Sequence, residues 1–219
     1  MIEAGSGQKY IDTVIFDIGN VLMSFQWIPY MRTMFDEPMI RRVNRAIWGS
    51  GLWNEMDRGL KTGMELLPEM QARDPEIQDE IKQAFLHCGK CMHRMDYAAP
   101  WIRELHQRGF RTLYLSNYSH YVMGRNPDVL YFLPELDGGI FSCDVKTIKP
   151  EKKIFEIAKE RYSLNLEKSV FLDDNPENVR ASRAFGLPAI RFTTYAETRP
   201  KLEETILGSD QFVTEPLPD

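Results

Sequence analysis

The sequence predicts an α/β fold, a parallel β-sheet with packed helices, interrupted by a small helical bundle. Short apolar runs recur along the chain, and helical patterns lie between them. One long stretch, residues 27–96, has helical spacing and no convincing strand. Alternation of strands and helices is typical of parallel sheets, whose right-handed crossovers bring the carboxyl ends of all strands to one edge.

Four apolar runs are the predicted strands. Residues 13–16 lead into Asp17, residues 112–115 into Ser116 and residues 169–172 into Asp173, while residues 189–192 form a weaker fourth run. The first three are short and continuous rather than alternating. This is the pattern of strands buried on both faces of a sheet.

Helix signals separate these runs. Asn175 is placed to cap a helix that has Pro176 at its first position and ends at Gly186. Pro150 is expected to open a second helix, with apolar residues at helical spacing up to residue 162. A third helix around Trp101 is expected to end at residue 109.

The composition is that of an ordinary globular protein. The chain has 219 residues, of which 43% are hydrophobic and 27% charged, with a net charge of −5. Without clustered basic residues we expect no nucleic-acid partner, and no apolar stretch is long enough for a membrane span. Residues 1–9 lack a signal-peptide pattern and the three cysteines fit a reducing compartment, so we expect a cytoplasmic protein, monomeric or weakly homo-oligomeric.

Polar residues end the predicted strands at the edge where parallel sheets bind ligands. Asp17, Ser116 and Asp173 lie there, Asp174 is adjacent, and Lys149 precedes a predicted helix. Neighbouring carboxylates repel, so a shared site requires a cation or a raised pKa. Mg²⁺ accepts carboxylate and phosphate oxygens, and the sequence therefore predicts a Mg²⁺ site beside a phosphate.

The same residue types fit phosphoryl transfer. Asp17 can offer one oxygen to the metal and attack phosphorus with the other. The transferring phosphoryl group needs donors for its non-bridging oxygens. Ser116 offers a hydroxyl, Asn117 an amide and Lys149 a positive charge.

Four segments carry a family resemblance. Residues 16–22 (FDIGNVL), 115–117 (LSN), 149–151 (KPE) and 171–175 (FLDDN) resemble, in order, the four motifs of the haloacid dehalogenase-like hydrolases. The resemblance implies a Rossmann-like, three-layer parallel-sheet core formed by residues 10–26 and 97–210. It also implies an α-helical cap formed by residues 27–96.

The resemblance also implies roles. Asp17 matches the nucleophile of a magnesium-dependent phosphatase that acts on a small phosphorylated metabolite through an aspartyl-phosphate. Ser116 and Lys149 match phosphate-binding residues that take part in catalysis. Asp174 and the backbone carbonyl of Gly19 match metal ligands, together with Asp17, and Asp173 matches a supporting catalytic position.

One position departs from the family pattern. Most phosphatases of this family carry a second Asp, the general acid and base, two residues after the nucleophile, where this chain has Gly19. The Asp-x-Gly-Asn-Val pattern resembles a subgroup that includes a bacterial α-D-glucose-1-phosphate phosphatase. An anomeric oxygen leaves readily, so the substrate is expected to be a sugar phosphate.

Two other functions remain open. A 2-haloacid dehalogenase shares the nucleophilic Asp but tends to have Ser-Asn where this chain has Asp173 and Asp174, and Tyr where it has Gly19. A non-catalytic phosphate-binding regulatory module fits the absent second Asp.

Two further features have ordinary structural explanations. The Cys-x-x-Cys pair at residues 88–91 lacks a second ligand pair for zinc. The segment Asp57-Arg58-Gly59 is a candidate cap loop, although an interhelical turn is the simpler interpretation.

Overall fold

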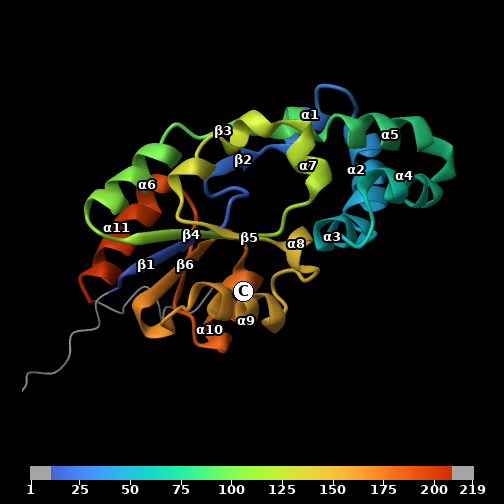
Figure 1. Ribbon diagram of the computed structural model, residues 1–219. Helices are drawn as coiled ribbons and strands as arrows, with labels where there is room; N and C mark the ends of the chain where they lie inside the picture. Colours follow the sequence, from blue (N-terminus) through green and yellow to red (C-terminus); the bar gives the residue numbers. More distant parts are fainter. Residues whose placement is uncertain (1–10, 209–219) are drawn as a thin grey trace, which may run out of the picture.

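The computed structural model describes residues 11–208, and its centre is a parallel sheet (Figure 1). Among these residues, five strands pair in the order β5-β4-β1-β6-β7. Residues 1–9, for which the sequence predicts no signal peptide, lie outside the described range. So do residues 10, 209 and 210, at the two ends of the predicted core. The strands are β1 (Thr13–Phe16), β4 (Arg111–Ser116), β5 (Gly139–Phe141), β6 (Ser169–Asp173) and β7 (Ala189–Arg191).

The central strand explains the layers. Side chains of β1 alternate between two apolar clusters, with Val14 and Phe16 in one and Ile15 in the other. Helices α6 (Ala98–Gln107) and α11 (Tyr195–Ile206) cover the first face of the sheet, and α9 (Lys152–Tyr162) and α10 (Pro176–Phe185) cover the second (Figure 1). Phe16 packs edge-on against Trp101 of α6, with ring centroids 5.0 Å apart. The predicted three-layer α/β core is confirmed.

Two sequence predictions need correction. Strand β5 was not predicted, because it has only three residues and begins with Gly139, where an added Cβ would collide with Tyr114 of β4. The helix expected to open at Pro150 begins at Lys152, with Glu151 as its N-cap residue. The predicted cap of α10 is confirmed, because the Asn175 side chain accepts a hydrogen bond from the Glu177 amide.

Between β1 and α6 the chain forms a helical insertion, here residues 27–91. It contains α1 (Trp27–Met31), α2 (Glu37–Ile47), α3 (Leu52–Arg58), α4 (Gly63–Ala72) and α5 (Gln78–Leu86). The expectation of no strand in residues 27–96 is wrong at its end, since β3 (Met92–Arg94) pairs antiparallel with β2 (Met23–Phe25). Strand β3 is too short for a recognisable alternation.

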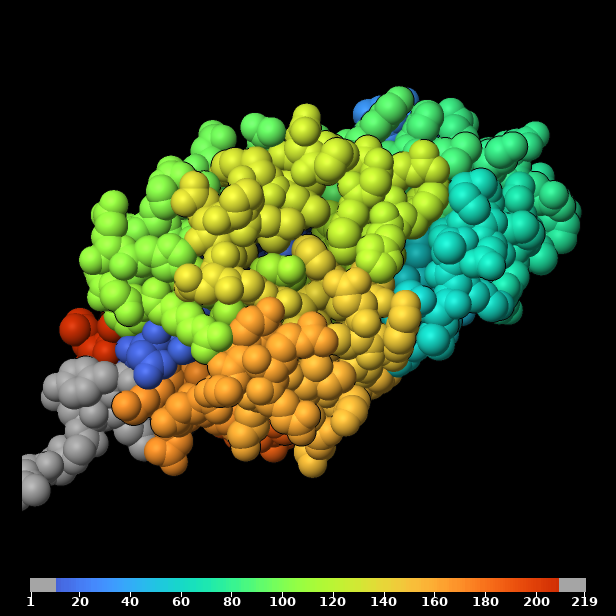
Figure 2. Space-filling view, viewed as in Figure 1, coloured from blue at the N-terminus to red at the C-terminus, as the bar shows by residue number. Residues whose placement is uncertain are grey.

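The insertion lies at one end of the molecule and meets the core segment that follows β5 (Figure 2). Within the described residues, no helix combines the length and apolarity that a membrane crossing requires. The remaining elements are short. They are α7 (His120–Arg125), α8 (Ser142–Val145), and the 3₁₀ helices η1 (Pro75–Ile77), η2 (Cys88–Cys91), η3 (Pro127–Leu130), η4 (Leu133–Glu135) and η5 (Leu166–Lys168).

Candidate active site

Three strand ends deliver carboxylates and a hydroxyl to one edge of the sheet. Asp17 follows β1, while Ser116 and Asp173 are the last residues of the two strands that flank it. All three side chains are buried. The neighbouring Ser116 hydroxyl acts to lower the pKa of Asp17, although this effect is smaller than that of burial, which raises it. The predicted convergence at the strand ends is present.

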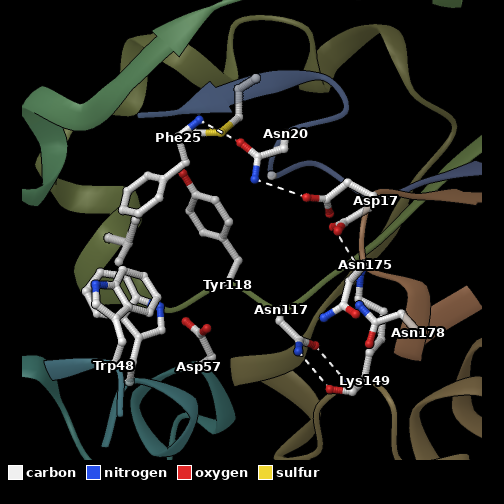
Figure 3. A pocket seen from close by; sticks show the side chains of 15 residues that line it. Asp17, Asn20, Phe25, Trp48, Asp57, Asn117, Tyr118, Lys149, Asn175 and Asn178 are labelled. Atoms are coloured by element: carbon white, nitrogen blue, oxygen red, sulfur yellow. Dashed lines mark hydrogen bonds and ion pairs between the residues drawn. The ribbon is translucent and has the colours of Figure 1, made fainter. Parts of the chain in front are cut away.

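A cavity of about 240 Å³ opens at this edge, between the core and the helical insertion (Figure 3). Its core side is polar, and its insertion side is mostly aromatic and apolar. The lining residues are Asp17, Gly19, Asn20, Met23, Phe25, Trp48, Trp53, Asp57, Asn117, Tyr118, Val122, Lys149, Asp174, Asn175 and Asn178.

Lys149 links two of the carboxylates. Its Nζ lies 3.0 Å from Asp17 Oδ1 and 2.6 Å from Asp173 Oδ2, and its side chain is fully buried. Burial acts to lower the pKa of this ammonium, but the charges of Asp17 and Asp173 raise the pKa overall. Lys149 is therefore a fixed positive charge beside Asp17.

Asp173 is held from several directions. Besides Lys149, it accepts a 2.8 Å hydrogen bond from the Asn175 amide and 3.1 Å bonds from Asn178 Nδ2 to both carboxylate oxygens. Its side chain is fully buried. These bonds satisfy a charge that would otherwise be costly to bury, and they fix Lys149. The role of Asn178 could not be predicted from the sequence, because one Asn on a helix carries no distinctive signal.

Asn117 and Lys149 also hold each other through the backbone. Asn117 Nδ2 donates to the Lys149 carbonyl at 2.9 Å, and the Lys149 amide donates to Asn117 Oδ1 at 2.8 Å. One of the two N–H donors of the Asn117 amide is therefore engaged within the protein. In this structure Asn117 therefore fixes the backbone position of Lys149.

Asn20 was missed by sequence analysis. It has a left-handed backbone (φ 55°), which Asn tolerates better than most residues. Its Nδ2 donates to Asp174 Oδ2 at 3.1 Å, and its Oδ1 accepts from the Phe25 amide at 3.0 Å. Asn20 thus orients Asp174 and connects it to β2. The only available signal was its position within the first motif.

The carboxylates form a donor set suited to a divalent cation. Asp17, Asp173 and Asp174 each offer an oxygen, and these atoms lie within 4.8 Å of one another. Burial, followed by the charges of Asp173 and Asp174, raises the pKa of Asp17 to about 7 against the opposing effect of Lys149. Burial also raises the pKa of Asp174. Three carboxylates against one ammonium leave an excess of negative charge, and hard oxygen ligands suit Mg²⁺.

The insertion contributes most of the opposite wall, and Phe25 of β2 completes it. Trp48 and Trp53 stack with ring centroids 4.0 Å apart, and Phe25 packs against both. Asp57, at the end of α3, is the carboxyl group on this side of the cavity (Figure 3). Burial, and secondly the charge of Asp17, raise the pKa of Asp57 to about 8. The turn that follows Asp57 is interhelical, as expected, but the Asp57 carboxyl faces the predicted site.

The Cys-x-x-Cys pair lies away from this cavity. Cys88 and Cys91 are buried free thiols, and burial raises the pKa of each to about 12. A thiolate is the form that binds metal or reacts, so these two cysteines act as core residues.

Comparisons with known proteins agree with this geometry. A family model described as haloacid dehalogenase-like hydrolase matches residues 11–186. A sesquiterpene phosphatase of Aspergillus oryzae is 23% identical over 88% of this chain and 95% of its own length. An acyl-CoA dehydrogenase family member 10 of mouse is 30% identical, but the match covers 49% of this chain and only 10% of the mouse protein.

Solved structures share the fold. A HAD-like family hydrolase from Porphyromonas gingivalis superposes with a TM-score of 0.67 at 19% identity, covering 90% of this chain and 98% of the other. A HAD family enzyme from Bacteroides thetaiotaomicron, in complex with magnesium and inorganic phosphate, gives 0.63 at 15% identity over 86% and 98% of the two chains.

Proposed function

The chain belongs to the haloacid dehalogenase-like hydrolases, and from this membership we propose that it is a magnesium-dependent phosphatase acting through an aspartyl-phosphate at Asp17. The observation that carries the proposal is Lys149 between Asp17 and Asp173, next to a third carboxylate, Asp174. Fixed positive charge beside an anionic nucleophile favours the approach of a phosphate dianion.

Each core residue has a role in this proposal. Asp17 attacks phosphorus, while Ser116, Lys149 and the free amide N–H of Asn117 donate to the phosphoryl oxygens. Asp17, Asp174 and the carbonyl of Gly19 would hold Mg²⁺, which supplies charge neutralisation between nucleophile and phosphate. Asp173 positions Lys149.

The organic part of the substrate would lie against the helical insertion. We propose that this insertion and residues 92–96 together act as a cap, with the predicted bounds 27–96. The first candidate is a small sugar phosphate, whose anomeric oxygen leaves readily. The aromatic wall supports a second candidate, the phosphate ester of an apolar alcohol, because Phe25, Trp48 and Trp53 offer large apolar faces. The A. oryzae relative is named for a phosphatase activity on sesquiterpenes.

Hydrolysis of p-nitrophenyl phosphate tests the proposal. We expect steady turnover with Mg²⁺, loss of turnover with EDTA, and loss in Asp17→Asn. Phosphate binding without turnover would indicate a regulatory module instead. Metal-independent release of halide from a 2-haloacid would indicate a dehalogenase.

A substrate panel tests the finer proposals. Higher kcat/KM on glucose 1-phosphate than on glucose 6-phosphate supports the sugar candidate, and preference for farnesyl phosphate over both supports the apolar one. Cell fractionation and light scattering test the accompanying expectation of a cytoplasmic monomer or weak homo-oligomer.

A further inference from the structure

The proposed reaction needs a proton donor that the first motif does not supply. Position 19 is a glycine, and an added Cβ there would meet no heavy atom within 4 Å. Steric crowding therefore does not explain the missing side chain. Asp17, Asp57 and Asp174 are the carboxylic acids lining the cavity within the described residues. Two of them belong to the proposed metal site, which leaves Asp57.

Asp57 is placed across the cavity from the nucleophile. It comes from α3 of the insertion and its carboxyl points into the cavity, whereas Asp17 lies on the sheet side (Figure 3). In phosphoryl transfer, the attacking and leaving oxygens lie roughly in line on opposite sides of phosphorus. A phosphoryl group next to Asp17 therefore directs its leaving oxygen away from the sheet, toward the side that carries Asp57.

Several contacts hold the end of α3 against the core. Ser142 Oγ donates to the Asp57 carbonyl at 2.5 Å, and Lys146 Nζ donates to the Gly59 carbonyl at 2.7 Å. Gly59 has a left-handed backbone (φ 75°) and lies so close to Cys143 that any Cβ would collide with its backbone. The carboxyl of Asp57 is therefore presented by a fixed backbone.

A bidentate ion pair reinforces this junction. Arg58 donates to both carboxylate oxygens of Glu151, at 2.6 and 2.9 Å, from the residue next to Asp57. The Glu151 pKa is lowered to about 2, first by hydrogen bonding to Arg58. Because Arg58 is paired with Glu151, its guanidinium is directed at the core and not at the Asp57 carboxyl.

We propose that Asp57 is the general acid and base of this enzyme, supplied by the insertion in place of a carboxyl at position 19. The inference rests on the proposed phosphatase function. In the first step, Asp17 forms a bond to phosphorus, the bond from phosphorus to the leaving oxygen breaks, and that oxygen takes the proton of Asp57. In the second step, water attacks phosphorus, the Asp57 carboxylate takes the water proton, and the bond to Asp17 breaks. Free phosphate and protonated Asp57 result.

The surroundings of Asp57 keep it protonated near neutral pH. Its pKa is raised to about 8, mainly by burial and then by the charge of Asp17, against the smaller opposing effects of the Trp53 indole and the charge of Lys149. The other titratable groups that sense its charge are Tyr118 and Cys143. Both have raised pKa values and remain neutral near pH 7.

The test compares two leaving groups in Asp57→Asn. General acid catalysis typically contributes about 10²–10⁴-fold, so we expect kcat for an alkyl phosphate to fall by about that factor. Hydrolysis of p-nitrophenyl phosphate is expected to fall far less, because p-nitrophenolate leaves without a proton. Both rates come from one preparation, so a folding defect lowers them together and leaves their ratio unchanged.

Two further variants complete the test. Gly19→Asp in the Asp57→Asn background places a carboxyl at the open position and is expected to restore part of the alkyl phosphate rate. Asp79→Asn, an exposed acid on α5 of the insertion, is the matched control and is expected to leave the ratio unchanged.

An unchanged ratio in Asp57→Asn would overturn the inference. If Asp17→Asn is inactive in the same assays, the proposed phosphatase function would stand without it. Absence of any magnesium-dependent turnover by the wild-type protein would instead remove the proposed function itself.

Discussion

The two walls of the cavity are built on different principles. The sheet wall is a dense polar network, in which Lys149 and Asp173 are fully buried and Lys149 pairs with both Asp17 and Asp173. The insertion wall consists of stacked aromatic rings with one carboxyl, that of Asp57, whose pKa is raised by burial. The sheet wall suits the phosphate group, which all phosphate esters share, and the insertion wall suits the organic group, which differs among them.

The largest expected effect comes from a substitution in the sheet wall. In Lys149→Met, the buried carboxylates of Asp17 and Asp173 lose their common cation. Removing one partner of a buried ion pair costs about 3–5 kcal/mol, so we expect the free energy of unfolding in urea to fall by that amount and activity to disappear. Lys152→Met, at an exposed lysine on α9, is the control. If Lys149→Met were as stable as the wild-type protein, the charge of Lys149 would not be needed to stabilise the buried carboxylates.

Magnesium binding gives the next largest effect. A ligand at one hundred times its Kd stabilises the folded state by about 2.7 kcal/mol. Mg²⁺ is therefore expected to raise Tm and EDTA to reverse the rise. Asp174→Asn should lose the shift. Asp144→Asn, in a separate His120–Cys143–Asp144 cluster, should keep it. An undiminished shift in Asp174→Asn would place the metal elsewhere.

The insertion wall has a pH signature. The pKa of Asp57 in the folded protein, about 8, lies above the ordinary carboxyl value of 3.8, so the folded state binds one more proton than the unfolded state between these two pH values. Its contribution to stability is therefore fully present below about pH 4 and is lost as pH rises toward 8. Relative to wild type, Asp57→Asn should become more stable as pH rises, by on the order of 1 kcal/mol per pH unit. Parallel pH profiles from urea unfolding would contradict a buried, protonated Asp57.

The smallest effect concerns the junction between the walls. Glu151→Gln removes the ion pair with Arg58, which is partly exposed and therefore screened, so we expect a loss of about 1 kcal/mol or less at pH 7. The folded pKa of Glu151 is lowered, so this contribution exists above about pH 4.5 and disappears toward pH 2. Urea unfolding at pH 7 and pH 3 measures it. A constant difference at both values would rule out the ion pair as its source.

The same contrast explains what sequence could predict. Asp17, Ser116 and Asp173 follow buried apolar runs, and the parallel topology then places them together. Asp57 follows no such rule, because its place in the cavity depends on how α3 packs against α8. Strands β3 and β5 have three residues each, too few for a pattern to emerge. Asn20 and Asn178 each act through the hydrogen bonds of one side-chain amide, and an isolated amide leaves no periodic signal in a sequence.

Chemical trapping tests the central claim most directly. An acyl phosphate is reduced by borohydride, so quenching the enzyme during turnover should convert Asp17 to homoserine, detectable by peptide mass spectrometry. We expect this conversion only when substrate and Mg²⁺ are both present. Steady turnover with Asp17 recovered unmodified, or with the modification on another carboxylate, would contradict the account.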